Sequence, residues 1–310
     1  MDSTGNVAVV VPTYNRHSLL KRALDSICKQ TVQPAHVVVV DDASPAPVAP
    51  FLEDQYDGLS LTVIRHDENR GAAAARNTGV ESVDTEYVAF LDSDDYWDNG
   101  KLAAQLDVFE SNPDLSLVYC DQYIVEPDET IRSSNKDLPE GNVWSDLLNG
   151  WTAPNTSTLV FNRGKFLDLG GFDTSMDSCQ DHDLWMQLAY NGHQVGVVTE
   201  PLSYFTRDAD DRISYNYVAR MDGVDTFLQK WRSSFIEARS KNEFQQFAAD
   251  YRAMAAIPIA YNALLRGDIQ IFIDICREYL LFNKSAYEFV FESVSTLIDR
   301  LFRKVKNRIN

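Results

Sequence analysis

The chain has 310 residues, of which 45% are apolar and 24% are charged, and its 28 basic and 46 acidic side chains give a formal net charge of −18. This composition excludes a disordered chain and a collagen-like repeat, and it supplies enough apolar residues for one large domain or two ordinary ones. The acidic balance argues against general nucleic-acid binding, which needs a basic surface.

The choice of charged residues is uneven. Asp outnumbers Glu by 32 to 14, and Arg outnumbers Lys by 18 to 10. An Asp-rich, Lys-poor surface suits a protein that stays soluble in high salt, and an ordinary acidic mesophile protein is the alternative. The four cysteines are far apart and form no CxxC pair, so a thiolate zinc site is not expected and a reduced cytoplasmic location is the simplest prediction.

The first 130 residues alternate between apolar runs and segments with helical periodicity. β-Branched runs such as Val7–Val11 are typical of strands that are buried on both faces. Strands are predicted at Val7–Val11, Val37–Val40, Leu61–Ile64, Tyr87–Leu91 and Leu115–Cys120, and helices at Arg16–Gln30, Gly71–Val83 and Asn99–Glu110. This alternation predicts an α/β fold with a mostly parallel central sheet that is flanked by helices.

The pattern becomes mixed after residue 130. It predicts a polar hairpin or loop at Glu126–Pro139, strands at Thr158–Phe161 and Val195–Val198, and a helix at Asp181–Tyr190. Beyond Ser214 the chain is predicted to be helical to its end, at Tyr217–Trp231, Glu243–Leu265, Ile269–Phe282 and Ala286–Val305. We therefore predict an α/β domain over residues 1–212 and a helical C-terminal extension over residues 213–310.

No window reaches the 18 uncharged apolar residues expected of a membrane-spanning helix. The last predicted helix is nevertheless amphipathic, and five bases and no acids follow Asp299, so residues 1–299 carry 23 − 46 = −23 charges. This pattern fits a helix that lies on an anionic membrane. Packing of its apolar face on the helical extension or on a second subunit is the alternative.

Three polar clusters follow predicted strands, at Pro12–Asn15, Asp41-Asp42 and Asp92–Asp95. In open α/β sheets, ligands bind beyond the carboxyl ends of the strands, so this shared position marks the expected site. Tyr14 could stack on a nucleobase, and Asp42 could accept a hydrogen bond from a base or a ribose. Packing and loop capping are the respective alternatives.

The Asp92–Asp95 cluster brings three carboxylates together. They repel one another unless a cation lies among them, and oxygen-only ligands suit Mg²⁺ or Mn²⁺. A solvated acidic turn is the alternative in such an acidic chain.

Small residues open the predicted helix at Gly71–Asn77, where they allow backbone N–H groups to approach a phosphate. Arg76 could add a charge-assisted contact, and ordinary helix packing is the alternative. Neither GxGxxG nor GxxxxGK[ST] is present, so Rossmann dinucleotide binding and P-loop ATP hydrolysis lose support.

The segment Gln180–Trp185 precedes an amphipathic helix. Asp181 or Asp183 is either the N-cap of this helix or, in the case of Asp181, a general base that faces the metal site. His182 could assist the metal or the acceptor, although a lone histidine is more often structural.

Five segments together resemble glycosyltransferase family 2, whose members have the glycosyltransferase A fold. They occur in the family's order and spacing, and the resemblance covers roughly residues 7–210. The segments are VPTYNR (11–16), VVVDDAS (38–44), NRGAAAARNTG (69–79), YVAFLDSDDYW (87–97) and GGFDTSMDSCQDHDLWMQLA (170–189).

The resemblance implies transfer of a sugar from a nucleotide-diphosphate sugar, with a UDP-sugar favoured, and inversion at the anomeric carbon. It also implies Mg²⁺ or Mn²⁺ as the cofactor. Asp94 matches the metal ligand, with Asp95 close by. The residues that match the nucleotide-sugar site are Pro12, Thr13, Tyr14, Asp42, Arg76 and Asp92.

On the acceptor side, the resemblance identifies Asp181 as the catalytic base, with Gln180, His182 and Trp151 nearby. The family usually has Glu where Gln180 stands. Gln keeps the size and the hydrogen bonding but loses the charge, which implies an altered acceptor site. The family often has a His where this chain has Arg207, so a histidine metal ligand is not expected.

Two other functions are open. Sugar nucleotidyltransferases have a similar sheet, but they use a Gly-rich loop near the N-terminus, and residues 13–16 lack those glycines. The second is a catalytically inactive carbohydrate-binding or scaffold subunit. The presence of Asp42, Asp92, Asp94 and Asp181 argues against it.

The motifs do not specify the acceptor. The salt-adapted composition suggests a halophilic prokaryote, and similar family members in haloarchaea often build surface glycans on lipid-phosphate carriers, including those for protein N-glycosylation. A lipid-phosphate-linked saccharide or another glycan is therefore the expected acceptor, and no nucleic acid is expected as a partner. The protein would act in the cytoplasm or at the cytoplasmic face of the membrane, which the C-terminal helix would contact.

Overall fold

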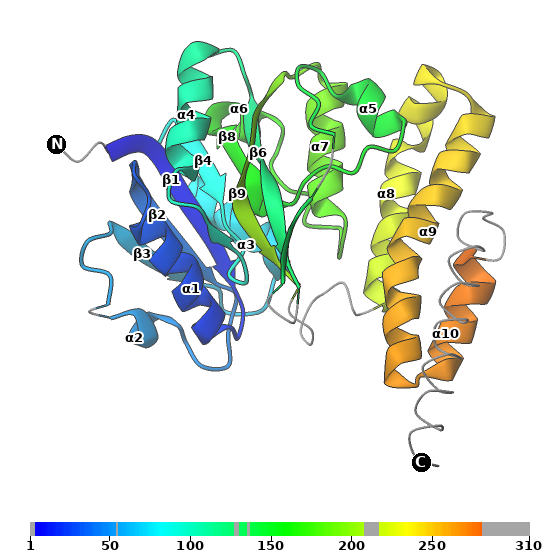
Figure 1. Cartoon of the computed structure of the whole chain (residues 1–310), viewed down its shortest axis with the longest axis horizontal. Coiled ribbons are helices and arrows are strands. Elements are labelled where there is room, and N and C mark those ends of the chain that lie inside the picture. Colours follow the sequence, from blue (N-terminus) through cyan, green and yellow to red (C-terminus); the bar gives the residue numbers. More distant parts are fainter. Residues whose placement is uncertain (1–3, 54, 127–129, 135–136, 208–216, 281–310) are drawn as a thin grey trace. The chain divides into compact units, whose positions relative to one another are not determined.

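A computed structural model of the chain describes residues 4–53, 55–126, 130–134, 137–207 and 217–280 (Figure 1). The described residues belong to two compact units, one from Met1–Ser175 with Gln180–Ala209 and one from Met176–Cys179 with Asp210–Asn310. The predicted boundary at residue 212 and the predicted helix at Ala286–Val305 lie outside the described residues.

The first unit is built on one sheet. Its nine strands within the described residues are β1 (Thr4–Thr13), β2 (Gln33–Asp41), β3 (Leu61–Arg65), β4 (Tyr87–Phe90), β5 (Tyr96–Trp97), β6 (Leu117–Val125), β7 (Ile131–Ser133), β8 (Leu159–Asn162) and β9 (Val195–Thr206). They pair in the order β3-β2-β1-β4-β8-β6-β9-β5, with β7 beside β6. Because β8 is antiparallel to both of its neighbours, strands β3, β2, β1, β4, β6 and β9 run in one direction. The mostly parallel sheet of the prediction is confirmed.

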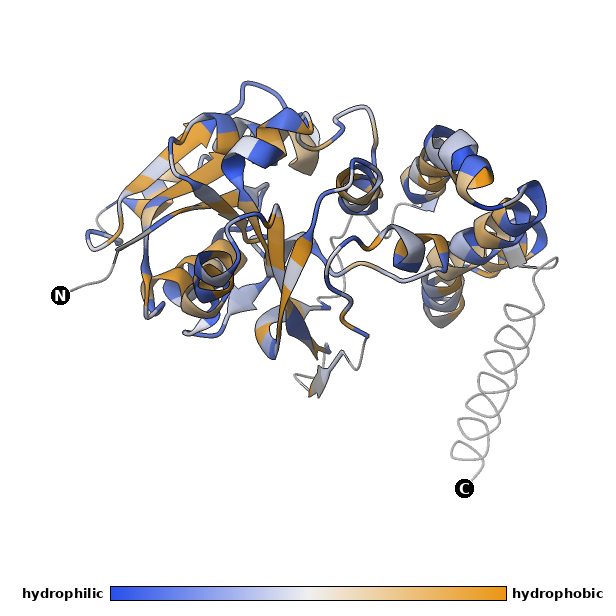
Figure 2. Cartoon of the chain, turned by 90° about the horizontal axis from the view of Figure 1, so that it is seen from above, coloured by the Kyte–Doolittle hydropathy of each residue, from blue (hydrophilic) through white to orange (hydrophobic). Residues whose placement is uncertain are grey.

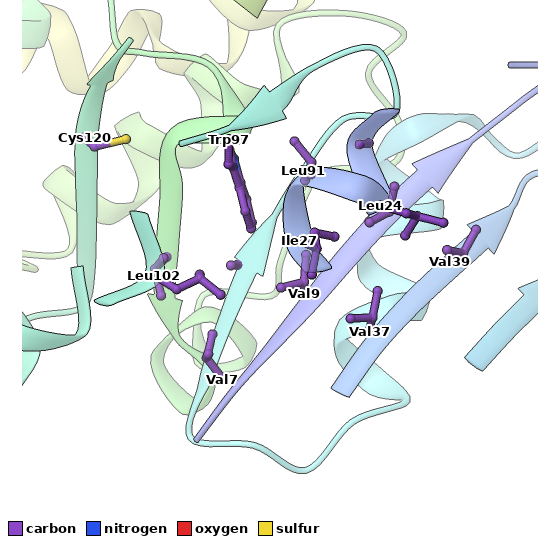
Figure 3. Close-up of a cluster of buried hydrophobic side chains, with 14 of the residues drawn as sticks. Val7, Val9, Leu24, Ile27, Val37, Val39, Leu91, Trp97, Leu102 and Cys120 are labelled. Atoms are coloured by element: carbon purple, nitrogen blue, oxygen red, sulfur yellow. The ribbon is translucent and has the colours of Figure 1, made fainter. Parts of the chain in front are cut away.

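Helices cover both faces of this sheet, and alternate residues of β1 point to opposite faces. One face packs against α1 (His17–Cys28) and α4 (Lys101–Ser111), which contribute Leu24 and Leu102 to a cluster with Val9 (Figure 3). The other face packs against α3 (Gly71–Glu81). There a Cβ on Gly79 would lie 2.3 Å from the Val10 side chain, so only glycine allows this close approach. Figure 2 shows hydrophobic residues concentrated along these strands.

Shorter elements complete the first unit. They are α2 (Ala49–Leu52), α5 (Trp144–Leu148), the 3₁₀ turn η1 (Thr156–Thr158), α6 (Arg163–Asp168) and α7 (Gln180–Tyr190). On α6, Phe166 packs against Phe90 at 5.5 Å and Phe172 at 5.6 Å between ring centroids. Strand β9 continues beyond its predicted end at Val198, because the pairing with β6 shifts register near Asp121 and then resumes.

The second unit is helical over residues 217–280, apart from short connections, and it also includes the non-helical segment Met176–Cys179. It contains α8 (Tyr217–Ala238), α9 (Lys241–Arg266), α10 (Ile269–Ile275) and the π-helical turn η3 (Cys276–Leu280). Helix α9 begins at the cap Ser240, which accepts the Glu243 N–H, and it ends at Gly267 in the left-handed conformation (φ 84°). Helices α8 and α9 pack through stacked Phe227 and Tyr251 rings, with centroids 4.8 Å apart. None of the described helices is long and apolar enough to cross a bilayer.

Candidate functional site

The three predicted polar clusters meet at one edge of the sheet. They follow β1, β2 and β4, which are adjacent and parallel. The Asp42 N–H donates to the Thr13 carbonyl at 2.9 Å, and the Leu91 N–H donates to the Val10 carbonyl at 3.1 Å. The structure therefore brings the three clusters together at the carboxyl ends of adjacent strands, where the strand pattern predicts the site.

Backbone strain is concentrated beside these clusters. Within the described residues, the non-glycine residues with left-handed backbone are Asn15 (φ 54°), Ala43 (φ 62°) and Cys179 (φ 66°). Each adjoins a predicted site segment, and Cys179 directly precedes Gln180 in sequence. Such conformations cost about 1 kcal/mol each and collect at functional sites. The Asn15 N–H donates to the Ser44 hydroxyl at 2.9 Å, which ties the β1 and β2 loops together.

Asp41 fixes the end of β2. Its carboxylate is fully buried and accepts the N–H groups of Ser44 at 2.9 Å and Val48 at 3.2 Å, together with the Arg65 guanidinium. Burial raises the pKa of Asp41, but the hydrogen bonds from Ser44, Val48 and Arg65 outweigh it and hold the pKa below its ordinary value. Asp41 is therefore a charged anchor for the loop that follows β2.

Asp42, the predicted base-binding acid, holds the start of α3. Its Oδ1 accepts the Arg70 N–H at 2.9 Å and lies 2.7 Å from His66 Nδ1, and its Oδ2 accepts the Gly71 N–H at 2.8 Å. The other ring nitrogen of His66 lies 3.0 Å from the Thr78 hydroxyl. The carboxylate thus aligns the Gly71–Asn77 helix start with the end of β2.

Arg76 reaches from α3 to the Asp92–Asp95 cluster. Its guanidinium is buried, donates to Asp92 Oδ1 at 2.5 Å and lies 5.3 Å from the centroid of the Phe172 ring. The second carboxylate oxygen of Asp92 accepts the Thr156 hydroxyl at 3.0 Å. The structure therefore joins Arg76 and Asp92, two residues that were predicted separately for the nucleotide-sugar site.

The other two carboxylates of the cluster have different surroundings. Asp94 Oδ2 lies 2.9 Å from Arg16 Nη1, and the Asp94 carbonyl accepts from Arg22 at 2.5 Å. Asp95 is 1% exposed, and its carboxylate accepts the Thr206 N–H at 3.0 Å and the Ser157 hydroxyl at 2.6 Å. Asp95 thus connects the loop after β4 to the end of β9.

Among the residues that the structure describes, four buried polar atoms near this edge have no hydrogen-bond partner. They are Thr13 Oγ1, Arg22 Nε, Arg76 Nε and Asn155 Oδ1. Buried polar atoms normally have partners, so a bound molecule with complementary donors and acceptors would complete them. Tyr14 beside Thr13 is 45% exposed, as a residue that stacks on a ligand would be.

The oxygen donors of the cluster fit a hard divalent cation only in part. Among the described residues, no group of three or more His, Cys, Asp and Glu side chains converges as a complete metal site. Mg²⁺ usually takes one or two carboxylates and completes its shell with phosphate and water. Asp94 can supply one such carboxylate, whereas Asp95 is engaged inside the fold.

The acceptor-side residues lie on or beside α7. Asp181 and Asp183 both stand in its first turn; Asp183 is fully buried and accepts from Gln187 at 2.6 Å, whereas Asp181 is half-buried. Gln180 and His182 are also half-buried. Trp151 packs edge to face on Trp185, with centroids 5.3 Å apart, so its ring contributes to an aromatic cluster.

The residues that hold the acids in place could not be predicted from the sequence. Arg16, His66, Thr156 and Ser157 contact the predicted acids from distant parts of the chain. Arg16 lies within the 11–16 segment of the family resemblance, but nothing in the sequence pairs it with Asp94.

Comparisons with known proteins identify the family to which the chain is similar. Residues 8–165 match the family model described as "Glycosyl transferase family 2". An uncharacterized glycosyltransferase of Haemophilus influenzae is 28% identical over 312 residues, covering 97% of this chain and 98% of its own. The amylovoran biosynthesis glycosyltransferase AmsB of Erwinia amylovora is 23% identical over 313 residues, covering 97% of both chains.

A solved structure shares the fold. Residues 1–349 of Staphylococcus aureus TarS, in complex with UDP-GlcNAc, align with a TM-score of 0.58 and 18% identity, covering 87% of this chain and 89% of that one. The likeness confirms the predicted architecture of a sheet flanked by helices with C-terminal helices beyond it.

Proposed function

The chain belongs to glycosyltransferase family 2, and from that premise we propose that it is an inverting enzyme that transfers a sugar from a UDP-sugar to a glycan or lipid-linked acceptor. The observation that carries the proposal is the Arg76–Asp92 pair at the carboxyl ends of β1 and β4, beside buried polar atoms that lack partners. TarS, a neighbour in fold, was solved with UDP-GlcNAc, which supports a UDP-sugar as donor.

The nucleotide would bind over the ends of β1 and β2. Tyr14 offers an exposed ring for stacking, and the buried Thr13 hydroxyl offers a hydrogen bond. Pro12 fixes the backbone that presents both residues. The Asp42 carboxylate already contacts His66 and the backbone N–H groups at the start of α3, and its remaining lone pairs would accept a hydrogen bond from the base or the ribose. Asp92 would contact the ribose.

The diphosphate would meet positive charge from two sides. Arg76 and Arg16 already lie against Asp92 and Asp94, and the first turn of α3 adds backbone N–H groups. We propose that Asp94 is the protein ligand of Mg²⁺ or Mn²⁺, with Asp95 holding the loop beneath it. Such an ion, when bound, would neutralise charge that develops on the leaving diphosphate.

Asp181 is the proposed general base. It would accept the proton of the acceptor hydroxyl while that oxygen attacks the anomeric carbon from the face opposite the diphosphate. The new glycosidic C–O bond forms as the C–O bond to the diphosphate breaks, so the configuration inverts. If the acceptor is a lipid phosphate, it is already anionic, and Asp181 matters less for proton removal.

We propose a role in glycan biosynthesis for this activity, and the similarity to the amylovoran biosynthesis glycosyltransferase AmsB of Erwinia amylovora supports it. Gln180, His182 and Trp151 would lie on the acceptor side. A haloarchaeal source, a lipid-phosphate-linked acceptor and a protein N-glycosylation pathway stay predictions, as do a location at the cytoplasmic face of a membrane and membrane contact by the C-terminal helix.

The test is product analysis with the full chain, Mn²⁺ and a panel of UDP-sugars, in low and high salt. We expect UDP release together with a glycosylated lipid-phosphate or saccharide acceptor, and opposite anomeric configurations in donor and product. Pyrophosphate release would instead identify a sugar nucleotidyltransferase. Absence of both hydrolysis and transfer with every donor would favour the inactive carbohydrate-binding or scaffold subunit.

A further inference from the structure

Lys101 is an unusual residue in the core of the first unit. It is fully buried at the first position of α4, next to Leu102 of the hydrophobic cluster in Figure 3. The structure gives it no carboxylate partner among the described residues; its ammonium group donates to Gln105 Oε1 at 2.6 Å and lies 4.1 Å from the centroid of the Trp97 ring. A buried cation without a counter-charge is costly, and the amino end of a helix makes it costlier. Stability alone therefore does not explain this lysine.

Both partners of Lys101 reach the same short turn. The Trp97 indole N–H donates to the Ser157 carbonyl at 2.7 Å. The Gln105 amide N–H₂ donates to the Thr158 carbonyl at 2.9 Å and to the Val118 carbonyl at 2.7 Å. Since an ammonium group only donates, its bond to Gln105 Oε1 fixes which end of the amide faces these two carbonyls.

The turn in question, η1, carries the hydroxyls that hold the acidic cluster. Its Thr156 hydroxyl donates to Asp92 Oδ2 at 3.0 Å, and its Ser157 hydroxyl donates to Asp95 Oδ2 at 2.6 Å. The Asp92 N–H in turn donates to Ser157 Oγ at 3.1 Å. All three residues of the turn are at most 3% exposed, so water has little access to their side of these bonds, and the Ser157–Asp95 bond is buried throughout.

We propose that Lys101 is a positioning residue for the donor site. It acts through Trp97 and Gln105 on the Thr156–Thr158 turn, and this turn fixes the position of the Asp92 carboxylate. The inference rests on the proposed function of that site. It assigns no contact between Lys101 and substrate. A buried ammonium group serves this role because it holds an amide oxygen and an indole ring face at once, which no neutral side chain of similar length does.

The test compares Lys101→Met with Lys241→Met, a matched control in which an exposed lysine is likewise the first residue of a helix. Met keeps the volume and removes the charge and the donors. We expect Lys101→Met to fold with an unchanged or higher unfolding midpoint, because a buried charge is removed. Its kcat/KM for the UDP-sugar should nevertheless fall on the order of 10-fold or more, since small displacements of a site residue are costly. The control should match the wild type.

Hydrogen exchange provides a readout that does not depend on activity. In Lys101→Met we expect faster amide exchange in peptides covering residues 88–96 and 153–160, which contain the Asp92 and Thr158 amides, and unchanged exchange elsewhere in the sheet. A merely structural role would lower the unfolding midpoint without this local pattern. If Lys101→Met does not fold, Trp97→Phe tests the same link, because it keeps an aromatic face and removes the indole donor.

Normal exchange at both peptides together with wild-type kcat/KM in the folded variant would overturn the proposal. Failure of the wild-type chain to bind UDP or to transfer any sugar would instead refute the proposed function. The exchange pattern would still decide whether Lys101 positions Asp92, so the two failures are distinguishable.

Discussion

The Arg76–Asp92 pair gives the sharpest prediction for the site. Asp92→Asn keeps the oxygen that accepts from Arg76 but removes the negative charge opposite a guanidinium that is 10% exposed. A charge-assisted bond stabilises by about 1.5–3 kcal/mol and a neutral one by about 1 kcal/mol. The Asp92 side chain is 26% exposed, so solvent screens part of the difference. We expect a loss of about 0.5–1.5 kcal/mol in the free energy of unfolding, together with weaker UDP binding.

Urea unfolding and calorimetry with UDP measure the two effects. The matched control is Asp84→Asn, because Asp84 faces Arg163 at 3.7 Å but is fully exposed, so its free energy of unfolding and UDP affinity should stay at wild-type values. Equal unfolding free energies for Asp92→Asn and Asp84→Asn would refute the view that this pair fixes Arg76. Unchanged UDP affinity would remove Asp92 from the nucleotide site.

Three further predictions follow from the same structure. Asp181→Asn should lower the rate of transfer to a sugar hydroxyl by at least ~10² with UDP affinity unchanged, and near-normal turnover would refute the base assignment. In calorimetry, Mn²⁺ should bind weakly when added alone and tightly only together with UDP, because the acids of the described residues do not converge on one point. Asp94→Ala should abolish the increase in Mn²⁺ affinity that UDP causes. Tight binding of Mn²⁺ alone would contradict this prediction. Burial lowers the pKa of Lys101 to about 8, so between pH 8 and 10.4 the unfolded state binds more protons than the folded state and the free energy of unfolding rises with pH. Between pH 7.5 and 9.5 the wild type should therefore gain about 2 kcal/mol in this free energy relative to Lys101→Met. Parallel curves of unfolding free energy against pH for the two proteins would contradict the burial of a charged Lys101.

The strands that position the site could be predicted because their signal is local. Continuous β-branched runs such as Val37–Val40 are buried on both faces and need no partner to be recognised. Strand β5 and helix α2 were missed, since elements of two and four residues carry no periodicity. The antiparallel insertion of β8 between β4 and β6 could not be predicted either, because strand order depends on packing between distant segments.

The acidic residues of the site could be predicted from the sequence, but the residues that pair with them could not. Asp92 and Asp94 stand out in sequence, because a cluster of like charges at a strand end is a local anomaly. Ser157 and His66 show no such anomaly, and their importance arises only when the chain brings them within 3 Å of an acid. A hydroxyl or a lone histidine thus acquires its role from long-range packing, which spacing along the chain does not encode.

The structure also changes the physical reason for expecting a cation among the three acids. Repulsion among the three carboxylates was the reason to predict a bound cation. In the structure each carboxylate has a partner of its own: Arg76 for Asp92, Arg16 for Asp94, and the Ser157 hydroxyl for Asp95. The fold therefore does not need an ion to hold the cluster together. In the proposed function, Arg76 and Arg16 would each have to bind both a carboxylate and the incoming diphosphate. The negative charge of that diphosphate would then help to recruit the metal. Under the proposed function, donor recognition and metal recruitment would then be a single event at this edge of the sheet.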